Sequence, residues 1–522
     1  MKIQNWANGT KTEETRGEIT AEPSPPGHSS LPRALPFTGL AFLLVAGCAV
    51  GPDFQPPARP DVTDYAATSL STTANSADTA GGEAQRFVKG MDIASDWWTL
   101  FHSKPLNDLI EQSLTNNHDL KAAQAALSVA RENVLAQRGV FYPNVSAGFS
   151  ASRQKQSAAL APTPNTNALQ FNLFTPQIAI SYMPDVFGLN HRTAESLAAQ
   201  EQGVRFQMVA TYTTLTANVV VTAIQEASVE TQIDATRQLI DVDTKILEIL
   251  KYQLAKGYAS GLDVAAQEAQ LAQLTATLPP LVKQSAQLHD LLATLAGLYP
   301  SQAPAGKFEL ASLQLPQDLP VSLPSELVTQ RPDVLQAEAN LHAASAQIGV
   351  AIANRLPNIE LTANAGSTAL AIDQVFASGT GFWSLGTAVT APIFQGGMLL
   401  HQERAAKDAY VQAAEQYRST VLNAVQNVAD TLVALEQDAE GLKAAVAAEA
   451  AANVTLNLAQ RQLQDGYAGY LSILSAQQAY QQARINRVQA EANRYADTAA
   501  LFQALGGGWW HRADLAEVKN EK

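Results

Sequence analysis

Two stretches of this chain carry the same landmarks in the same order, about 210 residues apart. Asp119-Leu120 is followed 24 residues after the aspartate by Pro143-Asn144, and Asp333-Val334 is followed at the same distance by Pro357-Asn358. A Gly-Tyr-Ala motif then comes later in each stretch. A period this long is unlike that of short-repeat solenoids, which is 20–50 residues. The pattern predicts two copies of one large unit, related by pseudo-symmetry.

Each copy begins with a helical segment, which in the first copy continues to about Arg138. Segments in which apolar and small polar residues alternate follow, at about residues 143–184 and 357–391. Alternation with period two predicts a pair of β-strands in each copy. Short strands with one apolar and one polar face are typical of transmembrane β-barrels. Water-soluble hairpins show the same alternation, so the pattern leaves both possibilities open.

A very long helical stretch follows each pair of strands. Residues 189–256 and 398–465 contain no proline and one glycine each. At 1.5 Å per residue, each stretch would form a helix roughly 100 Å long. A further helical run follows each Gly-Tyr-Ala turn, which predicts two long antiparallel hairpins, 189–297 and 396–505. In the first hairpin the expected coiled-coil seam contains Leu239, Val242, Ile246 and Ile249.

The only cysteine, Cys48, ends a short apolar stretch near the N-terminus. One cysteine excludes a disulfide framework or a CxxC redox pair within the chain. The apolar residues 37–46 are too few to span a bilayer as a helix. They end in Leu-x-Ala-Gly-Cys, which predicts a signal peptide over residues 1–47, with a long polar start, and a lipid-modified Cys48. The alternative is a buried helix that happens to end in cysteine.

These signals together predict the organisation of the whole chain. In order, we expect a signal peptide (1–47), a lipid-anchored tether (48–103), a first repeat (104–299), a proline-rich linker (300–323), a second repeat (324–508) and a C-terminal tail (509–522).

Four strands in one chain are too few to enclose a channel. A barrel needs about eight strands, and an open sheet in lipid leaves edge groups unsatisfied at a cost of several kcal/mol each. Beyond the N-terminal stretch, no segment is apolar enough for a transmembrane helix. If the strands lie in a membrane, the chain must therefore oligomerise. Two copies would fill their lumen with side chains, so we favour three, with the helices forming a second tube below.

Charge and motif content argue against nucleic-acid binding and catalysis. The formal net charge is −14, from 34 Lys+Arg against 48 Asp+Glu, which disfavours a nucleic-acid surface. The eight histidines are scattered, and no P-loop, GxGxxG or GxSxG motif occurs. Asp241 and Asp243 are most simply part of a solvated helix face. We therefore expect no enzyme activity, catalytic residue, metal or cofactor, and the energy for any transport must come from partners.

Short motifs spread from Cys48 to Trp509 carry a family resemblance. They are Cys48-Ala49-Val50-Gly51-Pro52-Asp53-Phe54, Trp97-Trp98-Thr99-Leu100-Phe101, Pro143-Asn144, Asp185-Val186-Phe187-Gly188, Arg331-Pro332-Asp333-Val334, Pro392-Ile393-Phe394-Gln395-Gly396-Gly397 and Leu505-Gly506-Gly507-Gly508-Trp509. In these motifs the chain resembles the TolC-like outer membrane factors of tripartite efflux systems, most closely the NodT-type lipoproteins.

The resemblance implies a mostly α-helical protein with a transmembrane β portion, built from two tandem repeats. It implies a homotrimer with a 12-stranded barrel and a periplasmic α-barrel, anchored to outer membrane lipid through Cys48. The partners it implies are a periplasmic adaptor (membrane fusion protein) and an inner-membrane pump of the RND type. The implied function is a passive conduit in the cell outer membrane that exports drugs and other toxic small molecules. A type I secretion conduit for a polypeptide is the alternative, and a periplasmic coiled-coil scaffold without a pore is a third reading.

In that family the hairpin tips form the periplasmic entrance and the adaptor-docking surface. The matching docking positions are Gly257, Tyr258, Ala259, Ser260, Leu262, Gly466, Tyr467, Ala468 and Tyr470; the matching entrance positions are Asp263, Leu471, Ser472 and Ser475. The family entrance is often ringed by aspartates, but the second tip here carries Ser472 and Ser475. Closure is therefore predicted to depend more on Leu471 than on charge. The alternative is that the tips are only turns, which need Gly257 and Gly466.

Overall fold

The computed structural model describes residues 49–65, 72–76, 79–155, 157, 170–303, 306–465, 467 and 469–516. The chain divides into Met1–Ala46 and Gly47–Lys522, and everything described belongs to the second unit. The predicted signal peptide, Cys48, Gly466 and Ala468 lie outside the described residues.

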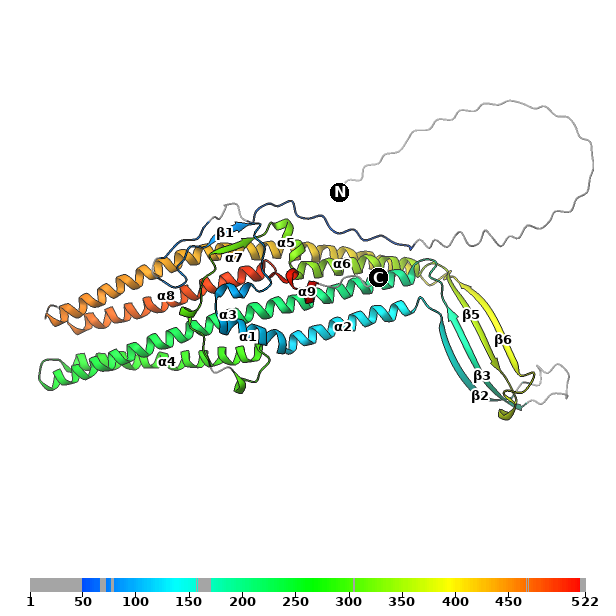
Figure 1. The fold of residues 1–522 in the computed structure, drawn as a ribbon, viewed down its shortest axis with the longest axis horizontal. Coiled ribbons are helices and arrows are strands. Elements are labelled where there is room, and N and C mark those ends of the chain that lie inside the picture. Colours follow the sequence, from blue (N-terminus) through cyan, green and yellow to red (C-terminus); the bar gives the residue numbers. More distant parts are fainter. Residues whose placement is uncertain are drawn as a thin grey trace, which may run out of the picture. The chain divides into compact units, whose positions relative to one another are not determined.

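Two long helical hairpins of equal size make up the helical body (Figure 1). Helices α3 (Leu189–Ala255) and α7 (Met398–Gln464) have 67 residues each. Their return helices, α4 (Gly261–Leu295) and α8 (Tyr470–Ala504), have 35 residues each. Both long helices start after a glycine with positive φ, which ends the preceding extended chain without steric strain. The two turns lie at the end of the helices opposite to the strands.

The landmark aspartates of the repeat lie in the first turns of two equivalent helices. Asp119 belongs to α2 (His118–Gly139), which packs on α3, and Asp333 belongs to α6 (Pro332–Ala353), which packs on both α3 and α7. An acidic side chain there is stabilised by the positive end of the helix dipole. The α3–α6 contact therefore joins the first repeat to the second.

None of the described helices is long and apolar enough to cross a bilayer.

Four antiparallel strands form one sheet that both repeats share. The strands are β2 (Asn144–Lys155), β3 (Gln170–Tyr182), β5 (Asn358–Ser367) and β6 (Gly381–Thr390), and their order in the sheet is β2-β3-β5-β6. The pairing of β3 with β5, from Tyr182↔Leu361 to Gln177↔Gly366, crosses from one repeat to the other. β2 and β6 are the edge strands.

Segments outside the repeats are more ordered than the sequence indicated. Within the expected tether, β1 (Arg86–Lys89) pairs in parallel with β4 (Asp318–Val321) of the expected linker. Long-range hydrogen bonding fixes this part of the tether. Gln85 is fully buried and donates to Thr498 on α8 at 3.0 Å. The remaining elements are η1 (Trp97–Phe101), α1 (Lys104–Asn116), η3 (Pro300–Gln302), η4 (Leu310–Ser312), α5 (Pro324–Gln330), η5 (Ile372–Gln374), η6 (Trp509–His511) and α9 (Ala513–Ala516).

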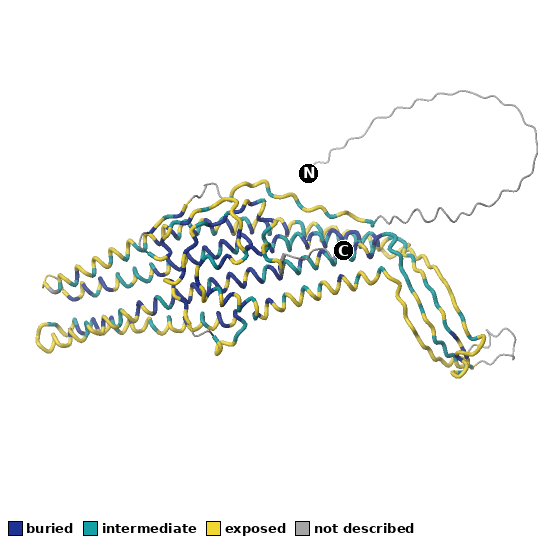
Figure 2. Tube along the Cα trace, viewed as in Figure 1, coloured by how far each residue is buried: buried dark blue, intermediate teal, exposed yellow. Residues whose placement is uncertain are grey.

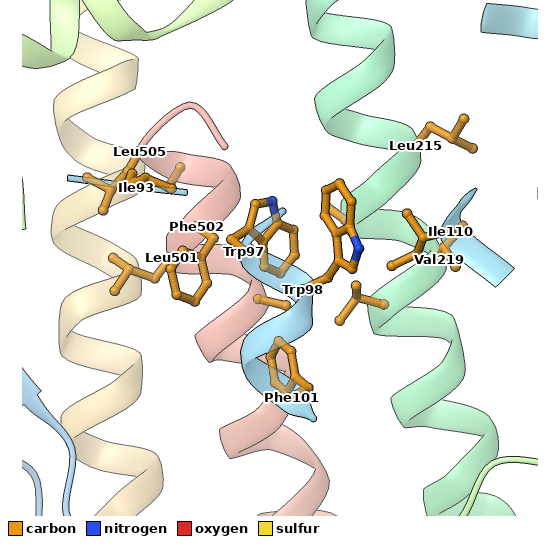
Figure 3. Packing of buried hydrophobic residues seen from close by; sticks show 14 of the residues in the cluster. Ile93, Trp97, Trp98, Phe101, Ile110, Leu215, Val219, Leu501, Phe502 and Leu505 are labelled. Carbon is orange, nitrogen blue, oxygen red and sulfur yellow. The ribbon is translucent and has the colours of Figure 1, made fainter. Parts of the chain in front are cut away.

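The main core lies at mid-length of the helices, where Figure 2 shows buried residues concentrated. Trp97 is 1% exposed and stacks on Phe502 of α8, with ring centroids 5.1 Å apart. Figure 3 shows Trp97, Trp98 and Phe101 lying between α8 and α3. Since α3 and α8 belong to different repeats, this aromatic cluster holds the two halves together by burying large apolar surface.

The coiled-coil seam predicted for the first hairpin is partly wrong. Val242 is 44% and Ile249 is 56% exposed, whereas Asp243 is 3% and Leu250 is 5% exposed. The buried positions recur every seven residues, one step away from the expected ones. Asp243 is therefore not on a solvated face, and its burial raises its pKa. The apolar Val242 and Ile249 remain on the surface of the chain.

Candidate functional sites: the sheet and the hairpin tips

One face of the four-stranded sheet is apolar and uncovered. The strand register aligns Val145, Ile180, Ala363 and Leu385 in one row across the sheet. The next row contains Ala147, Ile178, Ala365 and Trp383. Trp383 is 75% and Leu385 is 74% exposed. An apolar patch of this extent is unusual on a water-soluble surface and marks contact with another molecule or with lipid.

The opposite face of the sheet is polar. Its rows contain Ser146, Ala179, Asn364 and Ser384, and the Asn364 amide donates to Ser384 at 3.4 Å. The strands have 10 to 13 residues, and a tilted strand of about 9–11 residues spans a membrane. A sheet with one apolar face, one polar face and this strand length fits a wall between lipid and water.

The first hairpin tip turns at Gly257, whose φ is +78°. Ser260 then caps α4: its hydroxyl accepts from the Asp263 backbone N–H at 3.2 Å, and the Asp263 carboxylate accepts from the Ser260 N–H at 3.0 Å. The Asp263 carboxylate is thus part of a capping box that fixes the start of the helix. Beside it, Tyr258 is 84% and Leu262 is 68% exposed, and Ala259 is half-buried.

The second tip has no side-chain cap, because Gly469 takes the place that Ser260 has in the first. Tyr467 is 86% and Leu471 is 57% exposed, and Ser472 and Ser475 are exposed as well. The two tips therefore present one tyrosine and one leucine each at corresponding places: Tyr258 with Tyr467, and Leu262 with Leu471.

Tyr470 lies inside the protein and links the two hairpins. It is 6% exposed and packs with Leu250 and Val264 of the first hairpin. Its hydroxyl donates to the Gln267 side-chain oxygen, and the Gln267 amide donates to the Asp243 backbone oxygen at 3.0 Å. Burial raises the pKa of Tyr470, so it stays a neutral donor.

Gln267 and Asp243 of this link were not expected as site residues from the sequence. Nothing in the local pattern distinguishes one glutamine among the many on these helices, since the contact forms only when the second hairpin is present. Asp243 lies one step away from the seam expected from the sequence, so the apolar pattern did not mark it.

Within the part of the chain that the structure describes, no group of three or more His, Cys, Asp or Glu side chains could hold a metal ion.

Comparison with known proteins identifies the family. The family model of outer membrane efflux proteins matches residues 109–298 and 323–507. The chain is 30% identical over 496 residues to the toluene efflux pump outer membrane protein TtgC of Pseudomonas putida, covering 91% of this chain and 96% of TtgC. It is 27% identical over 484 residues to the outer membrane protein OprJ of Pseudomonas aeruginosa, covering 91% and 96%.

Solved structures show the same fold. The outer-membrane channel OprN matches with a TM-score of 0.78 at 25% identity, and the match covers 88% of this chain and all of that one. The matches to the family model, to relatives and to this structure each include both repeats. The chain therefore belongs to the outer membrane efflux protein family, and it is the outer membrane channel component of an efflux pump.

Proposed function

We propose that three copies of this chain close into one continuous duct, lipid-anchored through Cys48, which carries small molecules passively from a periplasmic adaptor and an RND-type pump to the exterior. The observation that carries the proposal is the state of the sheet edges. Among the described residues, the outer edges of β2 and β6 have no partner strand. In the repeat, β2 corresponds to β5 and β6 corresponds to β3. The edges of β5 and β3 that correspond to these two outer edges pair with each other. A second copy supplies the missing partner for each edge.

The repeat also predicts the register between copies. Within the chain, Ile180 pairs with Ala363. Asn144 pairs with Ser181 in the first strand pair and Asn358 with Thr390 in the second, which places Val389 at the position of Ile180. The repeat landmarks place Phe149 at the position of Ala363. We therefore expect Val389 of one copy to lie opposite Phe149 of the next copy. Both residues lie on the apolar face, as this pairing requires.

Paired cysteines test this closure. The double variant Val389→Cys with Phe149→Cys should give disulfide-linked trimers on mild oxidation in outer membranes. The matched control pairs Val389→Cys with Ser150→Cys, which lies one residue away from Phe149 and on the other face. An amine-reactive cross-linker reports the oligomeric state independently of the introduced cysteines. Trimers without the expected disulfide would refute the register alone, and monomers only would refute the trimer.

Adaptor docking is proposed for the exposed parts of the two tips. Tyr258 and Tyr467 are the most exposed aromatic side chains there, at 84% and 86%, and exposed tyrosines are common anchors of protein interfaces. Tyr470 is buried in the single chain, so it supports the tip from inside. The double variant Tyr258→Ala with Tyr467→Ala should lose co-purification with the adaptor and sensitise cells to exported drugs. Tyr299→Ala, which changes another exposed tyrosine far from the tips, is the control and should do neither.

Entrance closure is proposed to depend on Leu471. Asp263 is engaged in its capping box and the second tip carries serines, so an apolar constriction is favoured over an acidic ring. Leu471→Ser should raise single-channel conductance in planar bilayers. The equivalent change at the first tip, Leu262→Ser, is the control and should change it less. No rise for Leu471→Ser removes this leucine from the gate.

Small molecules are favoured as cargo because the relative TtgC is the outer membrane protein of a toluene efflux pump. A deletion strain separates this from polypeptide secretion. Greater drug or solvent sensitivity supports the proposal, whereas unchanged sensitivity with loss of one secreted protein supports a type I secretion conduit. A scaffold without a pore is disfavoured by the uncovered apolar face of the sheet, and channel activity in bilayers would exclude it.

A further inference from the structure

The segment that directly follows Cys48 is held by a buried arginine at the start of the first long helix. The Arg192 side chain is 4% exposed. Its Nε donates to the Val50 carbonyl at 3.0 Å, and its Nη2 donates to Asp53 at 2.7 Å and to the Gly51 carbonyl at 3.4 Å. A buried guanidinium needs acceptors for its donors, and here the N-terminal segment provides most of them.

The backbone of this segment lies against glycines that leave no room for side chains. A Cβ on Gly349 would lie 2.8 Å from the Val50 carbonyl oxygen and 2.7 Å from the Arg192 side chain. A Cβ on Gly188 would collide with Ala49, and one on Gly51 would collide with Gly349. The Val50 N–H donates to the Phe187 carbonyl at 3.1 Å. The contact is therefore backbone against backbone, and only glycine permits it.

A second set of contacts closes the site from the other repeat. Phe54 stacks on His342 of α6, with ring centroids 4.3 Å apart and planes 11° apart. His342 contacts Glu195 at 3.0 Å, and Glu195 accepts from Arg192 at 2.7 Å. Arg192 and Glu195 belong to α3, whereas His342 and Gly349 belong to α6. The segment thus lies across the junction between the repeats.

The equivalent positions elsewhere in the chain cannot form such a site. In the second long helix, His401 is found at the place of Arg192, and it is exposed. In α2, Leu135 takes the place of Gly349, and it is 49% exposed. Leucine there would fill the space that the backbone of the segment needs. Among the described residues, the repeat therefore offers one seat for this segment, at the α3–α6 junction.

We propose that residues 49–54 act as an intramolecular peptide ligand of this seat, formed by Gly188, Arg192, Glu195, His342 and Gly349. The seat holds the N-terminal segment at the strand-side end of the helices, and it does so without help from a lipid on Cys48. Lipid attachment to Cys48 is part of the proposed function, whereas the inference of the seat does not depend on that proposal. Arg192 is the positioning residue, since it donates to two backbone carbonyls and one side chain of the segment.

Hydrogen exchange of the full-length protein tests this. Exchange in residues 49–58 should become about tenfold faster or more in Arg192→Ala and in Gly349→Leu, because charged hydrogen bonds or the backbone contact are lost. The control His401→Ala changes the equivalent position and should leave the segment protected. Asp53→Asn should have a smaller effect, because the Asp53 side chain is 87% exposed.

A Cys48→Ser protein exported behind an ordinary cleavable signal peptide tests the independence from lipid. Its segment should exchange as slowly as in the wild type. Unchanged exchange in both Arg192→Ala and Gly349→Leu, with the helices still protected, would overturn the seat, and so would loss of protection in Cys48→Ser. Missing lipid on wild-type Cys48, or a monomeric protein, would instead count against the proposed function while leaving the seat intact.

Discussion

The two hairpins have the same lengths but differ where each meets the segments outside the repeats. Every helical position of the second hairpin follows its counterpart by 209 residues, as Leu189 to Met398 and Gly261 to Tyr470 show. Under this correspondence, Ser285 on α4 matches Arg494 on α8, and Glu226 on α3 matches Leu435 on α7.

The first hairpin uses carboxylates to bind the linker. Glu226 is fully buried and contacts His289 at 2.8 Å, and burial raises the pKa of Glu226. One turn further, Glu230 accepts from Lys307 of the linker at 2.5 Å and from Ser285. A carboxylate on the long helix thus binds the one lysine of the linker.

The second hairpin uses a cation for the same purpose. Arg494 is fully buried and donates to Thr73 at 3.2 Å, to the Glu83 carbonyl at 3.1 Å and to Gln85 at 3.0 Å. These acceptors all lie in the segment before the first repeat. Two copies of one scaffold therefore bind different segments, because they carry different polar side chains at corresponding positions. The lesson is that the repeat fixes geometry while a few buried polar side chains decide which segment packs where.

The largest effect is expected at the aromatic cluster that both hairpins share. Trp97→Ala should destabilise the protein by about 3–5 kcal/mol, the usual cost of removing a buried tryptophan from a core. Because Trp97 lies between α3 and α8, hydrogen exchange should rise in both hairpins together. If only one hairpin loosened, the two would be shown to fold independently.

The next largest loss of stability is expected in the second hairpin and not in the first. Arg494→Met leaves several buried acceptors unsatisfied and should cost about 3 kcal/mol or more. The apparent Tm should fall, and exchange should rise in residues 72–89 before it rises in the linker. Ser285→Ala at the matching position removes one hydrogen-bond donor and should cost about 1 kcal/mol. Equal losses for the two variants would contradict the assignment of Arg494 as the residue that holds this segment.

A pH effect is expected in the second hairpin. Burial raises the pKa of Glu491 to about 7, although Arg487 donates to it at 2.9 Å, and Glu449 and Glu83 add negative charge nearby. The matching residue in the first hairpin is Val282, which does not titrate. Since the folded state holds this proton more tightly than the unfolded chain, its contribution is fully present below the ordinary glutamate pKa of about 4.5. The contribution is lost as the pH rises toward 7.

Glu491→Gln should therefore flatten the dependence of the apparent Tm on pH between about 5 and 7, and raise the Tm at pH 8 relative to the wild type. Glu440→Gln, an exposed change on α7, is the control and should follow the wild-type curve. A wild-type slope retained in Glu491→Gln would assign the pH effect to another group.

The smallest effects are expected at the tips. Ser260→Ala removes the cap of α4 and should cost about 1 kcal/mol, whereas Gly469→Ser adds a cap to α8 and should gain only a few tenths. Hydrogen exchange in the first turns of α4 and α8 measures both changes locally. A similar response at the two tips would show that the capping difference has no consequence there.

The repeat, the long helices and the alternating strands could be predicted because each depends on local signals, such as the absence of proline or the period of apolar residues. The burial of Tyr470 and Asp243 and the packing of residues 72–89 could not. Those features depend on single contacts between residues far apart in the chain, such as Gln85 with Thr498, and such contacts leave no periodic pattern. The seat for residues 49–54 was missed for the same reason, although its two glycines are visible in the sequence.

The equal lengths of the two hairpins restrict how this chain can change over evolutionary time. Each added helical residue displaces a tip by about 1.5 Å, so a seven-residue insertion in α7 alone would offset its tip from the other by about 10 Å. A partner that contacts both tips at the same height would then lose its contact with one of them. Length changes in one arm should therefore survive only when the other arm changes with it.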